Sequence, residues 1–404
     1  MTLTFISNYI NHHQIPFCNA LYEKLGENFH FIQTQPMEQE RIAMGWHADE
    51  TSLPYVRCLY EEEEKCHRMI MESDVLLAGW TDREDVIGER LMSGKLTIRI
   101  SERLYREGQW KAISPKGLIR KYKDHTRYRK GQVYLLCAGA YVPSDFHIVR
   151  AYPDKMYRWG YFPETVRYTD KEWEKLKDDN GCLNIVWAGR FIPLKHPEHM
   201  IMLAKQLKAR EDLWKQASGN PFERFQIHMV GSGELEDKIR NLAKEQGVEE
   251  CFVFYGFMPP EKVRKVMEIS HIHVFTSNQL EGWGAVVNEA MNSGCAEVAN
   301  VQVGAAPYLV EHGKNGLVYP DGNPDKMIEA VISLIEDPVQ RKAMGRAAYE
   351  TITGLWNAEH AAEELLRFSE SALCGTVIPA KEGPFSPAPV ISPAGMYRWM
   401  MGNK

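Results

Sequence analysis

Short apolar runs alternate with longer, helix-like segments along the chain, and this alternation constrains the fold more than any other feature. The strand-like runs of the first half are LTFIS, FHFIQT, DVLLAG, LTIRIS and VYLLCAG. Those of the second half are LNIVWAG, FQIHMVG, CFVFYG and IHVFTS. Strands that alternate with helices form parallel sheets, because each helix carries the chain back to the starting edge of the sheet. The sequence therefore predicts an α/β fold.

The alternation stops once and then restarts, which predicts two domains. Residues 169–181, TDKEWEKLKDDNG, are charged and poor in aliphatic side chains, as expected of a linker or an exposed helix. A chain of 404 residues also exceeds the size of one ordinary core. We expect Rossmann-like domains over residues 1–165 and 166–371, with their parallel sheets facing across a cleft. The proline-rich tail, residues 372–404, is expected to pack back on the first domain or to be partly disordered.

Composition places the chain among soluble globular proteins, with 44% hydrophobic and 25% charged residues. No run approaches the roughly 20 apolar residues that span a bilayer, and the first residues lack the pattern of a signal peptide. Eight scattered cysteines without a CxxC pair favour reduced thiols over disulfides or a zinc site, and predict a cytoplasmic location. The net charge of −6 gives no indication of nucleic-acid binding.

One local segment departs from this overall charge. Residues 103–130 hold ten Lys and Arg against two acids, Glu107 and Asp124, with Tyr and Trp side chains interleaved. Such a run can be a solvated surface. It can also be a face that contacts anionic lipid headgroups on the inner side of a membrane, or an anionic acceptor.

The strongest functional signal is the segment SNQLEGWGAVVNEAMNSG, residues 277–294. Glu281 and Glu289 have seven residues between them, and a glycine-rich loop, residues 282–284, lies beside the first of them. The loop opens a predicted helix, whose N-terminal N–H groups suit a phosphate. Carboxylates accept hydrogen bonds from vicinal hydroxyls. Together these groups predict a site for a phosphorylated and polyhydroxylated ligand, and a nucleotide-sugar fits that description best.

Two further loops of the second half can contribute to this site. Arg190 and Lys195 follow the strand NIVWAG, at the strand end where α/β sheets bind ligands, and two cations can neutralise a diphosphate. Their alternative is a pair of surface charges. Gly231 and Gly233 lie between a strand and a helix, where contact with phosphate or base and a simple tight turn are equally compatible with the spacing.

The first half offers weaker candidates. His12 and His13 follow the first strand, where histidine can act as a general base or bind an acceptor, or can be an ordinary loop residue. Glu102 and Arg103 follow LTIRIS and can contact an acceptor or pair with neighbours. In the second half, the alternating histidines of SHIHVFTS favour packing over metal binding, because no further ligands lie at a recognisable spacing.

Six motifs in order across residues 183–370 make the second half resemble the nucleotide-binding domain of family 4 glycosyltransferases, which adopt the GT-B fold. They are AGRFIPLK, HMVGSGELEDKI, FYGFMPPEKV, EGWGAVVNEA, GCAEVANVQVG and EHGKNGLVYP. The resemblance implies retaining transfer of a sugar from a nucleotide donor, without a metal or other cofactor. It makes the first domain the acceptor-binding one and the second the donor-binding one.

The resemblance also implies roles for individual residues. Arg190 and Lys195 would hold the diphosphate, Glu281 the donor sugar hydroxyls and Glu289 the ribose. Side chains near the nucleoside would be those of Phe257 and Met258, and backbone N–H groups toward sugar and phosphate would come from Gly282, Trp283, Gly284 and Ala285. The sequence departs from the family pattern at His196, where glycine is usual, at Ala296-Glu297, at Tyr308 and at the opening loop, Tyr9-Ile10-Asn11.

The resulting hypothesis is a glycosyltransferase that moves a sugar from a UDP- or GDP-linked donor to a glycan, a lipid-linked acceptor or a small-molecule alcohol. His13 is its candidate base, and the diphosphate itself can take the acceptor's proton. One alternative is a nucleotide-sugar epimerase or hydrolase of the same fold, which needs acid/base groups facing the sugar from both domains. Another is a catalytically silent nucleotide-sugar-binding partner.

Overall fold

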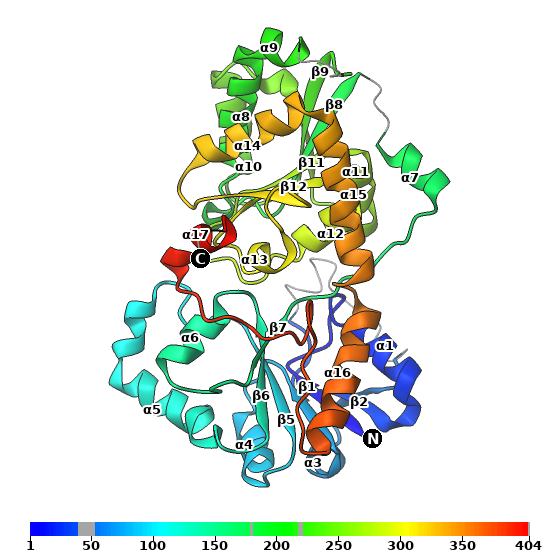
Figure 1. Cartoon of the computed structure of the whole chain (residues 1–404), viewed down its shortest axis with the longest axis vertical. Coiled ribbons are helices and arrows are strands. Elements are labelled where there is room, and N and C mark those ends of the chain that lie inside the picture. The colour runs from blue at the N-terminus through cyan, green and yellow to red at the C-terminus, as the bar shows by residue number, and fades with distance from the viewer. Residues whose placement is uncertain (39–52, 178–180, 217–220, 403–404) are drawn as a thin grey trace. The chain divides into compact units, whose positions relative to one another are not determined.

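A computed structural model of the chain describes residues 1–38, 53–177, 181–216 and 221–402 (Figure 1). The chain forms two compact units. Unit 1 comprises Met1–Glu164 and Leu355–Ser392, and unit 2 comprises Thr165–Gly354 and Pro393–Lys404. The sequence-based boundaries assign residues 355–371 to the second domain, whereas these residues group with unit 1.

Unit 1 contains a parallel sheet of seven strands in the described residues, in the order β3-β2-β1-β4-β5-β6-β7. The predicted apolar runs form β1, β2, β4, β5 and β6, while β3 and β7 are short and were not anticipated. Apolar side chains of these strands are buried beneath the helices, as in Ile6, Ile32 and Leu76, each 0% exposed. The strands are β1 (Leu3–Ser7), β2 (Phe29–Gln33), β3 (Val56–Cys58), β4 (Val75–Ala78), β5 (Thr97–Ser101), β6 (Val133–Ala138) and β7 (Met156–Trp159).

The last long helix, α16 (Ala358–Leu373), returns the chain to unit 1. It packs beside α1 (Ile15–Leu25), where Lys24 and Glu363 form an ion pair of 2.9 Å (Figure 1). Its Phe368 ring meets Tyr134 of β6 edge to face at 5.2 Å. The other helices of unit 1 are η1 (Gly26–Asn28), α3 (Glu63–Glu72), α4 (Glu84–Met92), η3 (Gln109–Ile113), α5 (Pro115–Asp124), η4 (Thr126–Tyr128) and α6 (Val142–Ile148).

Part of the proline-rich tail also belongs to unit 1. Its backbone runs along the edge strand β7: the Arg158 N–H donates to Ser386 O at 2.8 Å, and the Ala388 N–H donates to Met156 O at 3.0 Å. The ring of Phe385 is fully buried. The tail therefore covers a sheet edge that would otherwise present unpaired backbone groups.

Unit 2 contains a parallel sheet of six strands in the described residues, in the order β10-β9-β8-β11-β12-β13. The two parallel sheets confirm the predicted α/β fold class. The four predicted strands are the first four, and β12 and β13 extend the sheet. The strands are β8 (Cys182–Ala188), β9 (Arg224–Val230), β10 (Phe252–Gly256), β11 (Ile272–Phe275), β12 (Ala296–Asn300) and β13 (Gly316–Tyr319).

Helices cover both faces of this second sheet (Figure 1). The charged segment before β8 forms an exposed helix, α7, whose start is fixed by a capping box between Thr169 and Glu172. The helices of unit 2 are α7 (Asp170–Leu176), η5 (Pro193–Lys195), α8 (Glu198–Ala209), α9 (Glu211–Lys215), α10 (Glu236–Glu245), η6 (Glu249–Cys251), α11 (Pro260–Ile269), α12 (Val286–Asn292), α13 (Ala306–Leu309), α14 (Pro324–Glu336), α15 (Pro338–Gly354), η7 (Pro393–Gly395) and α17 (Met396–Met400).

Both sheets reverse their strand order at one point, which is where open α/β sheets bind ligands. In unit 2 the chain adds β9 and β10 on one side of β8 and then returns to place β11 on the other side. In unit 1 the same happens around β1, with β4 on the opposite side from β2. The loops after β8 and β11, and those after β1 and β4, are therefore the places to look for a site.

Candidate functional site

The structure brings the main predicted residues of unit 2 to the carboxyl ends of neighbouring strands. Arg190 and Lys195 follow β8, and Glu281 follows β11, so these side chains flank the point where the strand order reverses. The loop with Gly231 and Gly233 follows β9, and residues 257–258 follow β10. The predicted positions therefore meet at one edge of a single sheet.

Lys195 and Glu281 pair with each other in this edge. The Lys195 Nζ lies 2.5 Å from Glu281 Oε2, with 13% and 16% of the two side chains exposed. The Nζ also lies 5.0 Å from the ring centre of Phe275 on β11. The backbone O of Lys195 accepts a hydrogen bond from the Thr276 hydroxyl, and Thr276 in turn accepts one from the indole N–H of Trp187 on β8. This lysine is therefore held in place rather than free to sample solvent.

Arg190 differs from Lys195 because its guanidinium is exposed and has no hydrogen-bond or ion-pair partner among the described residues. The loop that carries it is fixed by its neighbours: the Phe191 N–H donates to Ser232 O at 2.9 Å. An arginine held on a fixed loop without a protein partner is available to bind an anion in bidentate fashion.

Gly231 and Gly233 have a clear structural role beside Arg190. Both have positive φ, +126° and +154°, and a Cβ at Gly231 would lie 2.0 Å from the backbone O of Gly189. A Cβ at Gly233 would lie 2.6 Å from the backbone O of Phe191. Only glycine allows the two loops to approach this closely. Their contact with phosphate or base stays a prediction.

The loop of residues 282–285 is tightly packed. Trp283 is 1% exposed, and its indole N–H donates to Asn288 Oδ1 at 2.8 Å. Gly284 has φ +89°, and a Cβ there would lie 2.9 Å from both the Phe275 ring and Val303. The backbone before α12 is therefore fixed by burial of Trp283. The contact of backbone N–H groups of this loop with a ligand stays a prediction for Gly282, Trp283, Gly284 and Ala285.

Glu289 is the second carboxylate of the predicted pair and lies on α12. It is half-buried, and its carboxylate has no hydrogen-bond or ion-pair partner in the described part of the chain. Burial raises its pKa above the ordinary value, an effect partly offset by the positive fields of Arg264 and His273. A half-buried carboxylate without a protein partner can accept hydrogen bonds from ligand hydroxyls.

Phe257 and Met258 directly follow β10. The Phe257 side chain is 57% exposed, whereas Met258 packs against the core beneath it.

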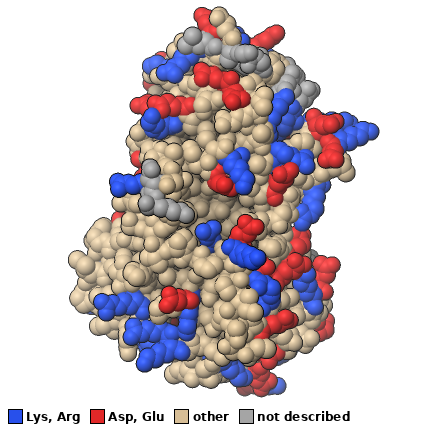
Figure 2. Space-filling view, in the orientation of Figure 1, with Lys and Arg blue, Asp and Glu red and all other residues tan. Residues whose placement is uncertain are grey.

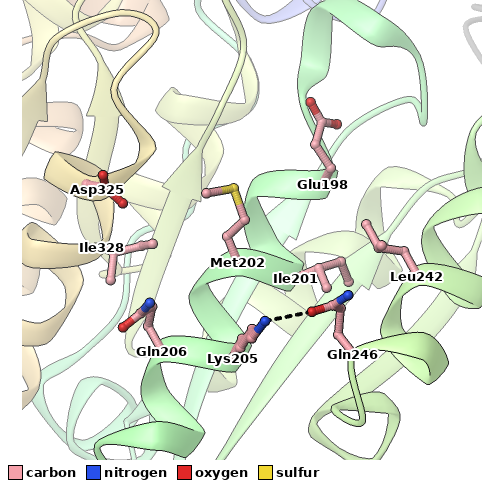
Figure 3. Close-up of a pocket in the computed structure, with 9 residues that line it drawn as sticks. All are labelled: Glu198, Ile201, Met202, Lys205, Gln206, Leu242, Gln246, Asp325 and Ile328. Carbon is pink, nitrogen blue, oxygen red and sulfur yellow. Dashed lines mark hydrogen bonds between the residues drawn. The ribbon is translucent and has the colours of Figure 1, made fainter.

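A pocket of about 390 Å³ lies elsewhere on unit 2, along α8 with α10 and α14, and is lined by residues that include Met202, Leu242 and Ile328 (Figure 3). It contains none of the predicted site residues.

In unit 1 the structure joins three candidates through a residue that sequence reasoning missed, Tyr161. The ring of His13 stacks on Tyr161 at 6.0 Å, and the ring of His12 lies 3.8 Å from His13. The Tyr161 hydroxyl donates to Glu102 Oε1 at 2.5 Å. Burial, with a smaller effect of His12, lowers the pKa of His13 to about 3. A neutral imidazole with so low a pKa is a poor general base near neutral pH but can still form hydrogen bonds.

Glu102 and Arg103 both pair within unit 1. Glu102 also forms an ion pair with Arg106, four residues later in the loop after β5. Arg103 is only 5% exposed; its Nε lies 3.6 Å from the buried Asp145 carboxylate, and its guanidinium stacks over Tyr141 at 4.9 Å. Their predicted contact with an acceptor stays a prediction, and the geometry gives Arg103 a role in packing.

The two histidines of SHIHVFTS are both buried. His271 Nδ1 accepts from the Asn184 N–H at 3.1 Å. His273 lies opposite Glu297 in the register of β11 and β12, and its Nδ1 is 2.7 Å from Glu297 Oε2 with both residues 0% exposed. Glu297, where the sequence departs from the family pattern, thus pairs with His273 of the neighbouring strand.

The basic segment of unit 1 has an unusual apolar face. On α5, Pro115, Leu118, Ile119 and Tyr122 recur at helical spacing and all are exposed, while no residue of the helix is fully buried. Helices that pack on a protein normally turn such a face inward. Figure 2 shows Lys and Arg gathered at the lower left, over this part of unit 1. The exposed cations beside the apolar face are Lys116, Arg120 and Lys123.

Asn278 is the main residue of the unit 2 site that the sequence did not reveal. Its N–H donates to Leu194 O at 3.0 Å, and its backbone O accepts from the Glu281 N–H at 3.0 Å. Its side chain contacts His196 Nε2 at 3.0 Å. Asn278 therefore connects the Lys195 loop to the turn that carries Glu281. The sequence feature that could have indicated Asn278 is its position three residues before Glu281.

Parts of the chain match known proteins in sequence. Residues 169–351 match the family described as glycosyl transferases group 1. The D-inositol 3-phosphate glycosyltransferase of Corynebacterium aurimucosum is 27% identical over 194 residues, 47% of this chain and 44% of that protein. The GDP-mannose-dependent alpha-(1-6)-phosphatidylinositol monomannoside mannosyltransferase of Mycobacterium tuberculosis is 25% identical over 190 residues, 46% of each chain. These matches span less than half the length of either relative.

Solved structures are similar over nearly the whole chain. HepE from Anabaena, in complex with UDP, has a TM-score of 0.66 at 13% identity and covers 92% of this chain and 100% of that one. WaaG, a glycosyltransferase involved in lipopolysaccharide biosynthesis, has a TM-score of 0.57 at 12% identity and covers 89% of this chain and 98% of that one.

The two parallel sheets and their structural neighbours define an α/β protein of the GT-B-like class. Within that class, the segment of residues 169–351 matches the group 1 glycosyltransferases. In the described residues, no helix is long and apolar enough to cross a membrane.

Proposed function

We propose that the protein transfers a sugar from a UDP- or GDP-linked donor to an acceptor hydroxyl. One observation carries the proposal. Around the strand reversal of unit 2 lie the Lys195–Glu281 pair and two charged side chains, Arg190 and Glu289, that have no partner among the described residues. Cations there suit a diphosphate, and carboxylates suit the hydroxyls of a sugar and a ribose. HepE, a solved neighbour, binds UDP, which agrees with this class of ligand.

Each residue then has a distinct role. Arg190 and Lys195 stabilise the negative charge that develops on the leaving diphosphate, the part of the reaction that most needs electrostatic help. Glu281 positions Lys195 and binds hydroxyls of the donor sugar. Glu289 binds the ribose hydroxyls, and the exposed ring of Phe257 adjoins the base.

The reaction needs no group beyond donor and acceptor. The acceptor oxygen bonds to the anomeric carbon on the face from which the diphosphate leaves, the carbon–oxygen bond to the diphosphate breaks, and the acceptor's proton passes to the diphosphate. The configuration at the anomeric carbon is then retained. This route assigns neither a covalent nucleophile to Glu281 nor a base to His13, whose imidazole would serve to orient the acceptor.

For the acceptor, we infer a lipid-linked or glycan hydroxyl presented at an anionic membrane surface. The curated relatives named above act on an inositol phosphate and on a phosphatidylinositol mannoside. The α5 surface supports the same location, because exposed Leu118, Ile119 and Tyr122 can enter the headgroup region while Arg120 and Lys123 contact anionic lipids. The protein would be peripheral on the membrane.

The test is turnover of a panel of UDP- and GDP-sugars with acceptors in phosphatidylglycerol and phosphatidylinositol vesicles, followed by NMR of the products. We expect free nucleotide diphosphate and an α-linked product from an α-linked donor. Interconverted or free sugar without acceptor product would instead indicate an epimerase or a hydrolase. Saturable nucleotide binding without turnover across the panel would indicate a silent binding partner.

A further inference from the structure

A cluster of two histidines and one carboxylate lies immediately after Lys195. His196 ends the η5 turn, and Glu198 and His199 lie on the first turn of α8. One ligand atom from each of the three residues lies within 4.8 Å of the others. All three are partly shielded from solvent rather than spread on an open surface.

The local geometry holds the three side chains toward one another. His196 has a left-handed backbone, with φ +46°, which is uncommon for a residue with a side chain and turns its imidazole back toward α8. Its Nδ1 lies 2.8 Å from Glu198 Oε1. The rings of His196 and His199 are parallel within 8°, with their centres 4.9 Å apart.

The hydrogen bonds of the cluster leave one nitrogen unsatisfied. Asn278 Oδ1 accepts from the Leu280 N–H, so its amide group donates to His196 Nε2, and His196 Nδ1 carries the proton that is donated to Glu198. By contrast, Nδ1 of His199 is buried and has no hydrogen-bond partner in the described part of the chain. A shielded imidazole nitrogen without a partner is costly unless a ligand satisfies it.

We propose that His196, Glu198 and His199 form a binding site for a divalent transition-metal cation of the zinc class. Two imidazoles and one carboxylate form a ligand set that suits Zn²⁺ and leaves one coordination position open. Ligand atoms about 2.0–2.1 Å from a tetrahedral metal are about 3.3 Å apart, so the present spacing needs to close by at most about 1.5 Å. Side-chain rotation of a glutamate and two histidines can supply that movement. The cation replaces the proton that His196 Nδ1 donates to Glu198; this proton moves to His196 Nε2, and the Asn278 amide turns so that its oxygen accepts it.

The site is separate from the proposed transfer chemistry, which needs no metal, and it does not depend on that chemistry being correct. Its place in the fold suggests what a bound cation would do. It would tie the η5 turn to α8, next to Lys195 and in contact with Asn278, and so hold the loop that carries Lys195. The expected effects are binding of the cation and a higher midpoint of thermal unfolding.

The experiment titrates Zn²⁺ into the full chain in the presence of a non-chelating reductant and a competing chromogenic chelator. We expect one saturable equivalent, with affinity reduced about tenfold or more in both His199→Ala and Glu198→Gln. His67→Ala is the matched control, because His67 forms a similar 2.8 Å pair with Glu89 but lacks a second imidazole in the described residues. Its affinity should equal that of the wild type.

Thermal unfolding with and without Zn²⁺ provides a second readout. The metal should raise the unfolding midpoint of the wild type and of His67→Ala, but not of the two cluster variants. Equal affinity in wild type and His199→Ala, or loss of binding only in Cys374→Ser, whose thiol is exposed, would overturn the proposal. Circular dichroism of each metal-free variant shows whether it is folded, and Glu198→Gln, which preserves side-chain size, gives the answer if His199→Ala is not.

Discussion

The two units share a strand order but differ in how their strand-end loops use charge. In unit 2, Arg190 and Glu289 have no partners in the described protein, and Lys195 is aligned by Glu281. In unit 1, the charged candidates Glu102 and Arg103 are both paired. Although the topology is the same, the strand-end loops of unit 2 hold charges without partners in the described protein, whereas the charged candidates of unit 1 are paired. This difference indicates that unpaired charge at the end of a strand, rather than the strand end itself, marks a site for a charged ligand.

Replacing Arg190 gives the largest expected change in function. Because its side chain has no partner in the described protein, Arg190→Ala should leave the unfolding midpoint unchanged while lowering kcat by about 100- to 1000-fold, as for loss of one group that stabilises transition-state charge. Steady-state kinetics with the preferred donor measures this effect. Lys262→Ala, an exposed cation outside the site, is the control. A normal kcat in Arg190→Ala would contradict the functional difference proposed between the strand-end charges of the two units.

Arg103 should show the opposite behaviour. Arg103→Ala leaves the buried Asp145 without its nearby cation, although Asp145 keeps hydrogen bonds from the Tyr105 N–H and from Gln109. The expected loss is about 1–3 kcal/mol in the free energy of unfolding, with little change in donor affinity. Chemical denaturation and nucleotide titration measure the two quantities. Full stability together with a raised KM for the acceptor would instead indicate that Arg103 binds the acceptor.

Much of the unit 2 site could be predicted from sequence because its residues lie in loops directly after strands. Arg190, Lys195 and Glu281 meet once the sheet order is known. What could not be predicted depends on contacts between distant segments. The pairing of Glu102 with Tyr161 spans 59 residues, and that of His273 with Glu297 spans two strands. The outward apolar face of α5 also has no sequence signal, because an amphipathic pattern does not state which side faces the protein.

Glu289 should make nucleotide binding depend on pH. Its pKa is raised by burial, so the carboxylate that accepts ribose hydroxyls is lost as pH falls through a value above that of an ordinary glutamate. Charged hydrogen bonds are worth about 1 kcal/mol more than neutral ones, so the wild type should bind UDP or GDP about fivefold more tightly than Glu289→Gln at pH 8. This ratio should approach one on acidification. Both proteins bind the same nucleotide, so the titration of the nucleotide itself cancels in the ratio of their affinities. A ratio that does not change with pH would exclude Glu289 from the ribose site.

An effect of similar size is expected for α5. Arg120→Ala should weaken partition onto phosphatidylglycerol vesicles about fivefold, since each cation near an anionic surface contributes about 1 kcal/mol. Ile119→Ser should weaken it too, with less dependence on salt because the lost contact is apolar. Lys171→Ala, an exposed cation of α7 in unit 2, is the control. Vesicle cosedimentation measures the partition of each variant. Equal partition of the wild type and the three variants would indicate that the segment is an ordinary solvated surface.

Binding of a nucleotide diphosphate at the strand ends of unit 2 can be measured by calorimetric titration with UDP and GDP. We expect one bound equivalent for the wild type, with binding weakened in Arg190→Ala and in Glu289→Ala but not in Lys262→Ala. Unchanged affinity in both site variants would contradict this expectation.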